Sequence, residues 1–105
     1  MQLDRNTNPS GKGKYALVNL RKIEGDPRTP EAMAEALKAY PGAIEFGFVG
    51  APDEFWPIKL KDKYAAAALA AYADAAQADD PEYAQQVRDL LKRAGPNSPF
   101  CKAPD

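Results

Sequence analysis

The stretch EFWPIKLKDKYAAAALAAYADAA, residues 54–76, decides the fold, because a strand pattern in it runs directly into a helix pattern. Apolar residues at alternate positions predict a strand over 55–60: Trp56, Ile58 and Leu60. Pro57 has no backbone N–H, so we expect this segment either to be an edge strand or to be irregular until about Ile58. The alanine run predicts a helix over 62–78, because alanine has the highest helix propensity and Asp62 is a favourable N-cap.

Upstream of this stretch the chain predicts two more strands and a helix. Apolar residues on both parities of 15–23 indicate a strand that is covered on both sides. Thr29 as N-cap, with Pro30 at the first helical position, predicts a helix to about Tyr40. Clean alternation over 44–48 predicts a strand with one buried face, formed by Ile44, Phe46 and Phe48.

Downstream, Asp80-Pro81 predicts the start of a third helix, over about 81–94. The tail from about residue 95 contains too much proline to be helical. Residues 1–13 are polar and rich in Asn, Gly and Ser, and we expect an irregular N-terminal arm. Residues 14–105 are of a length that predicts a single domain.

These elements predict an α+β fold with the order β-α-β-β-α-α and helices packed on one face of a three-stranded sheet. A right-handed crossover makes the first two strands parallel, and the third antiparallel to the second. The predicted core consists of the apolar faces of the second and third strands and of the apolar stripes of the helices. The helix stripes include Tyr72 and Tyr83. The opposite face then carries a mixture of aromatic and cationic side chains: Tyr15, Arg21, Phe55, Lys59 and Lys61.

Composition excludes several chemistries. The chain has no histidine and a single cysteine, Cys101, so Ser-His triads and the usual zinc sites are not available. No dinucleotide-binding, P-loop or metalloprotease motif is present. We therefore expect a non-enzymatic protein with no catalytic residues, no metal and no cofactor.

The charge balance and the hydropathy limit where the protein can be located and what it can bind. Fourteen basic residues against fifteen acidic ones give a formal net charge of -1, which provides no global attraction for nucleic acid or membrane. The N-terminus lacks the apolar core of a signal peptide, and no apolar run is long enough for a membrane span. With a lone cysteine, these features predict a cytoplasmic protein.

The aromatic and cationic face is the predicted binding site, and its occupant stays open between three alternatives. It is covered by the chain itself or by a second subunit in a homodimer, or it binds another protein. The third alternative is a nucleotide or single-stranded nucleic acid, since exposed aromatics and cations stack bases and hold phosphates. These alternatives give two functional hypotheses. The first is a binding module with a protein interface, and the second is a binder of nucleotides or single-stranded nucleic acid.

Three segments, GKGKYALVNLR (11–21), IKLKDKYAAAALAAYA (58–73) and AGPNSPFCKAPD (94–105), resemble a family of small uncharacterised proteins encoded by phages, prophages and proteobacteria. The resemblance implies no particular activity, so it assigns no functional residue. It does imply a context: an accessory or anti-defence factor that binds host proteins or signalling nucleotides.

Overall fold

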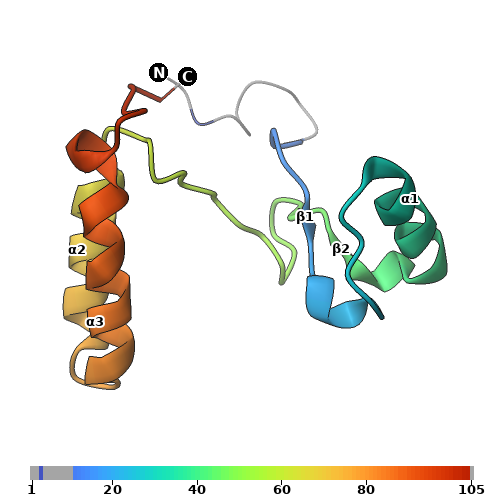
Figure 1. The fold of residues 1–105 in the computed structure, drawn as a ribbon, viewed down its shortest axis with the longest axis horizontal. Coiled ribbons are helices and arrows are strands. Elements are labelled where there is room, and N and C mark those ends of the chain that lie inside the picture. The colour runs from blue at the N-terminus through green and yellow to red at the C-terminus, as the bar shows by residue number, and fades with distance from the viewer. Residues whose placement is uncertain (1–2, 4–10, 105) are drawn as a thin grey trace. The chain divides into compact units, whose positions relative to one another are not determined.

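The computed structural model describes residue 3 and residues 11–104. Contacts within the chain divide it into two compact units, and the boundary falls between Phe55 and Trp56 (Figure 1). We call 2–55 the sheet unit and 56–105 the hairpin unit, and describe each by itself. The single domain expected over 14–105 stays a prediction, and most of the arm expected over 1–13 lies outside the described residues.

The sheet unit contains two short strands, β1 (Leu17–Val18) and β2 (Ile44–Glu45), so the α+β class is confirmed at this coarse level. The strands are antiparallel, with Leu17 opposite Glu45 and Val18 opposite Ile44, and the predicted parallel pairing is wrong. The predicted strand 15–23 also ends early, because Asn19 begins a single 3-10 turn, Leu20–Lys22. The Asn19 Oδ1 accepts a hydrogen bond from the Arg21 N–H at 3.1 Å, and this bond bends the chain away from the strand direction.

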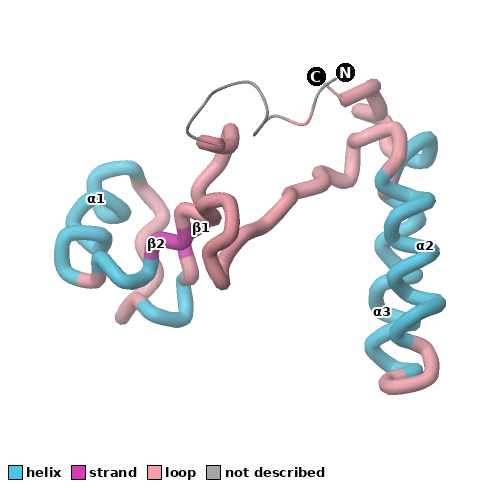
Figure 2. Tube along the Cα trace, turned by 180° about the vertical axis from the view of Figure 1, so that it is seen from behind, coloured by secondary structure: helices cyan, strands magenta, loops and turns pink. Residues whose placement is uncertain are grey.

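Helix α1 (Pro30–Ala39) connects the two strands and begins where the sequence predicts. The Thr29 Oγ1 accepts a hydrogen bond from the Ala32 N–H at 3.1 Å, and Pro30 occupies the first turn, where its missing N–H costs nothing. After α1 a second 3-10 turn, Pro41–Ala43, leads directly into β2. Figure 2 shows the two strands of this sheet as the short magenta segments.

The predicted third strand is not observed, because residues 54–59 form neither strand nor helix. Pro57 contributes no N–H and fixes its own φ, which removes a hydrogen bond from a run that is only six residues long. The core predicted on this run is correspondingly wrong: Trp56 is 66% exposed and Ile58 is also exposed. Leu60 is half-buried, and its carbonyl accepts a hydrogen bond from the Gly95 N–H at 2.8 Å.

The hairpin unit consists of α2 (Ala65–Ala76) and α3 (Pro81–Asp89), which lie side by side (Figures 1 and 2). The Asp80 Oδ1 caps α3 by accepting a hydrogen bond from the Tyr83 N–H at 3.0 Å, as the sequence predicts. The two helices bury mostly alanine, whose small side chains allow a close approach. The buried apolar residues of this unit are Ala65, Ala73, Ala84, Val87 and Ala94.

Two tyrosines of the predicted helix cores are exposed instead. Tyr72 on α2 and Tyr83 on α3 place their hydroxyl oxygens 2.9 Å apart, with their rings edge to face. A tyrosine hydroxyl needs a hydrogen-bond partner when it leaves water, so the rim of a helix pair suits this side chain better than the core. Close by, Arg88 of α3 donates hydrogen bonds to the side chains of Gln77 and Asp74, at 2.6 and 2.9 Å.

The tail after α3 closes the open end of the hairpin. A 3-10 turn, Leu90–Arg93, continues α3 and is followed by a second one, Gly95–Asn97. Lys102 then pairs with Asp62 in a parallel bridge: its N–H donates to the Lys61 carbonyl at 3.0 Å, and its carbonyl accepts from the Lys63 N–H at 2.9 Å. The tail is thereby held against the start of α2.

Candidate protein-interaction surface

The five residues predicted to share one sheet face are divided between the two units. Tyr15 and Arg21 flank β1, and Phe55 is the last residue of the sheet unit, whereas Lys59 and Lys61 belong to the hairpin unit. The face that was expected to join them requires the strand over 55–60, which is not formed. Their part in binding stays a prediction.

Two of these residues are exposed in the sheet unit with defined local contacts. The Lys14 Nζ lies 5.7 Å from the centroid of the Tyr15 ring, within the range of a cation–π interaction. The Arg21 side chain is exposed, and its backbone is fixed by Asn19. Both residues border β1 and are exposed in the sheet unit.

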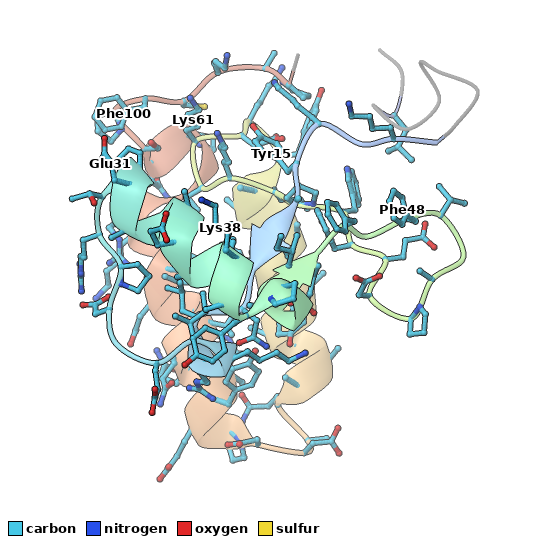
Figure 3. All side chains as sticks on the ribbon, turned by 90° about the vertical axis from the view of Figure 1, so that its right-hand side faces the viewer. Tyr15, Glu31, Lys38, Phe48, Lys61 and Phe100 are labelled. Atoms are coloured by element: carbon cyan, nitrogen blue, oxygen red, sulfur yellow. The ribbon has the colours of Figure 1, made fainter. Side chains whose placement is uncertain are left out.

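The sheet unit also presents an apolar surface that sequence reasoning places in the core. Phe46, Phe48 and Val49 follow β2 and are 51%, 56% and 60% exposed. The two phenylalanine rings are stacked, with centroids 5.5 Å apart and planes inclined by 12°. Figure 3 shows Phe48 on the loop beyond β2, away from α1, where Glu31 and Lys38 are labelled. We call residues 46–54 the aromatic loop.

Backbone geometry holds the aromatic loop in shape. Gly47 and Gly50 have φ angles of +63° and +83°, which glycine adopts without the steric cost that a Cβ brings. The Ala51 N–H donates to the Phe48 carbonyl at 2.9 Å, and the Glu54 N–H donates to the Ala51 carbonyl at 3.0 Å. The Glu54 Oε1 accepts from the Gly50 N–H at 2.9 Å. The exposed rings therefore stand on a loop with defined internal bonds.

Charges of both signs flank the exposed apolar side chains. A Cβ added to Gly11 would lie 2.9 Å from the Val49 Cγ2, so the chain before β1 lies against the aromatic loop. That chain carries Lys12 and Lys14, whereas the far end of the loop carries Asp53 and Glu54. An apolar centre with a polar rim of mixed charge is the usual anatomy of a protein–protein interface.

The described residues contain no group of three acidic, cysteine or histidine side chains that could hold a metal ion. Two tyrosines have a raised pKa: Tyr40, through the hydrogen bond it donates to Glu24 at 3.1 Å, and Tyr83, through its hydrogen bond with Tyr72. Both shifts make the phenol a weaker acid, so it stays protonated near neutral pH. The expectation that the protein is not an enzyme stays a prediction.

No helix in the described part of the chain combines the length and apolarity that a bilayer crossing requires. Neither a protein-family model, nor a curated protein, nor a solved structure matches the chain. The resemblance to a phage and proteobacterial family therefore stays a prediction, and the functional argument rests on the geometry of the described residues.

Proposed function

We propose that this protein is a non-enzymatic binding module that recognises another protein through its aromatic loop. The stacked pair Phe46–Phe48, more than half exposed on a hydrogen-bonded loop, carries this proposal. A cluster of exposed aromatic residues marks an interaction site, because burying these large apolar side chains against a partner is strongly favourable. Aromatic side chains are also the commonest anchors of protein interfaces.

The charges around the loop favour a protein over a nucleic acid as the partner. Asp53 and Glu54 lie on the same loop as the exposed rings and would repel a phosphate backbone. The alternative, a nucleotide or single-stranded nucleic-acid binder, relies on Tyr15 and Arg21 together with Lys59 and Lys61, which the structure divides between two units. A host protein bound by a cytoplasmic, phage-type accessory factor is the partner that the sequence resemblance favours, with a second subunit as the other protein candidate.

A peptide-display experiment tests the proposal. A random peptide library is selected against the immobilised protein, and the enriched peptides are then titrated against Phe46→Ser/Phe48→Ser. We expect at least a tenfold loss of affinity, since about 1.4 kcal/mol corresponds to a factor of ten and one interface aromatic contributes about that much. The matched control is Phe100→Ser, which removes a phenylalanine that is 74% exposed in the hairpin unit.

We expect both variants to fold, because the altered side chains are largely in water and contribute little to the core. Circular dichroism checks that they do. Equal binding of the selected peptides to the wild type and to Phe46→Ser/Phe48→Ser would refute the aromatic loop as the site. If Phe100→Ser also loses binding, the effect is not specific to the aromatic loop, and the assignment of the site to this loop is refuted.

A further inference from the structure

The outer edge of β1 has backbone hydrogen-bonding groups that point away from its partner strand. The Asn19 N–H donates to the Ala43 carbonyl at 2.8 Å, one step beyond the register in which Val18 lies opposite Ile44. Bonded and non-bonded pairs alternate in an antiparallel ladder, so Val18 belongs to a non-bonded pair. The N–H and C=O groups of Val18, and by the same alternation those of Ala16, are directed outward.

This edge is accessible in the described part of the chain. The sheet has only two strands, so β1 has no second strand beside it. Ala16 is exposed and Val18 is half-buried. Alternating outward donors and acceptors on a sheet edge form a template for an additional strand, which is one of the recurrent modes of peptide recognition.

The charges along this edge indicate what kind of peptide could bind there as an additional strand. Residues 11–22 contain four basic side chains and no acidic one: Lys12, Lys14, Arg21 and Lys22. Leu17 and Leu20, in the same segment, are 44% and 54% exposed and offer apolar contacts. From the open edge and its charge we propose that β1 accepts an extended, acidic peptide segment of a partner protein as a third strand of the sheet. This inference rests on the proposed function and specifies its partner.

The aromatic loop lies where it can add to such binding. Continuing the register by one residue places Ala16 opposite Phe46, on the same face of the sheet. Because Ala16 is small, a large apolar side chain on the added strand can reach across it toward the Phe46 ring. The edge thus supplies main-chain hydrogen bonds, and the aromatic loop supplies the apolar contact.

Two other occupants fit the edge less well. A second copy of this chain would bring one basic segment against another, and like charges directly opposite each other destabilise a strand pair. A single-stranded nucleic acid matches the charge, but its phosphates only accept hydrogen bonds. A phosphate backbone would offer no regularly spaced N–H donors to the outward C=O groups of Ala16 and Val18.

The first test uses synthetic peptides on the intact protein. The probe is a capped peptide of alternating Glu and Val, and its affinity is measured by calorimetry at low salt. One matched peptide replaces Glu by Lys, and a second keeps Glu and Val but carries N-methyl groups on alternate residues, which removes the donors of one edge. We expect binding of the Glu/Val peptide only, weakening as salt rises, and slower amide exchange at Ala16 and Val18 in the complex.

The second test changes the protein. Lys14→Glu/Arg21→Glu reverses two charges beside the edge, and we expect at least a tenfold loss of affinity for the Glu/Val peptide. The matched control, Lys38→Glu/Lys92→Glu, makes the same change in net charge on exposed residues outside the segment 11–22 and should bind as the wild type does. An equal loss in both variants would overturn the placement of the site.

Other outcomes separate this inference from the proposed function. Binding of the N-methylated peptide, equal binding of the Lys/Val peptide or preferential binding of oligothymidylate would each overturn the added strand. So would a failure of the Glu/Val peptide to bind. If the Glu/Val peptide fails to bind but library peptides still bind through Phe46 and Phe48, the proposed function stands. Only the inference that β1 accepts an acidic peptide strand is then wrong. If no library peptide depends on those two residues, the proposed function itself fails.

Discussion

The contact between Gly95 and the start of α2 allows a quantitative test of the hairpin unit. Gly95 is buried with a φ of +55°. In Gly95→Ala the added Cβ would lie 3.0 Å from the Ala66 Cβ, 3.2 Å from the Ala66 N and 3.3 Å from the Lys63 carbonyl oxygen. None of these atoms can rotate away, because two belong to the backbone and the third is fixed directly to it.

The expected cost has two parts. A left-handed backbone conformation costs a non-glycine residue roughly 1–2 kcal/mol, and overpacking a closely packed site costs about 1–3 kcal/mol more. The lower entropy of an unfolded chain with alanine returns about 0.4–1 kcal/mol. We therefore expect Gly95→Ala to lower the free energy of unfolding by about 1–4.5 kcal/mol, a large fraction of the total stability of a small protein.

The matched control is Gly25→Ala. Gly25 also has a positive φ, +81°, but an added Cβ there meets no atom within 4 Å. Only the backbone part of the cost applies, so we expect a loss of about 1 kcal/mol. Urea unfolding followed by far-ultraviolet circular dichroism measures both variants, and the steric part appears as a further decrease of roughly 1 M in the midpoint for Gly95→Ala. Equal midpoints for the two variants would refute the close approach of the tail to α2.

Two further predictions concern the helices of the same unit. Asp80→Ala removes the cap of α3 and should lower the free energy of unfolding by about 1 kcal/mol in urea titrations, whereas Asp79→Ala, which removes a neighbouring carboxylate, should cost clearly less; equal losses would contradict the cap. Tyr72→Phe should lower the pKa of Tyr83 toward 10.0, measured by tyrosinate absorbance, because the hydrogen bond with Tyr72 is the main cause of the raised pKa. Since that pKa is raised in the folded state, its contribution to stability is complete below the unfolded value and is lost as pH rises through the folded one. Stability should thus fall more steeply with alkaline pH in the wild type than in Tyr72→Phe, and identical pH profiles would argue against the tyrosine pair.

Local features of the fold are predictable from the sequence. Thr29-Pro30 and Asp80-Pro81 mark the starts of α1 and α3 correctly, because a cap depends on a few consecutive residues. The predicted helix of the alanine run is also confirmed, although it begins at Ala65 rather than directly after Asp62. The Asp62 carboxylate instead accepts a hydrogen bond from the Tyr64 N–H at 2.8 Å, and it lies two residues before the N-cap position, which Tyr64 occupies.

Features that depend on distant contacts are not predictable in the same way. Alternation over 44–48 places Phe46 and Phe48 on one side, and their stacked rings confirm this, but it does not tell whether anything covers that side. The single face expected for the site required a strand over 55–60 beside the strand over 44–48, and that strand is not formed. The aromatic loop was visible in the sequence as two phenylalanines before a turn, but the periodicity assigned them to a core.

The bridge between Asp62 and Lys102 has a consequence for synthesis of the chain on the ribosome. The residues that precede α2 are fixed by backbone hydrogen bonds to a segment that follows α3. A nascent chain that has released only α2 and α3 can form the helices, but the start of α2 frays until Lys102 has left the exit tunnel. Completion of the hairpin unit therefore waits for residues that are synthesised after both helices, and during the delay the alanine-lined faces of both helices are exposed to chaperones.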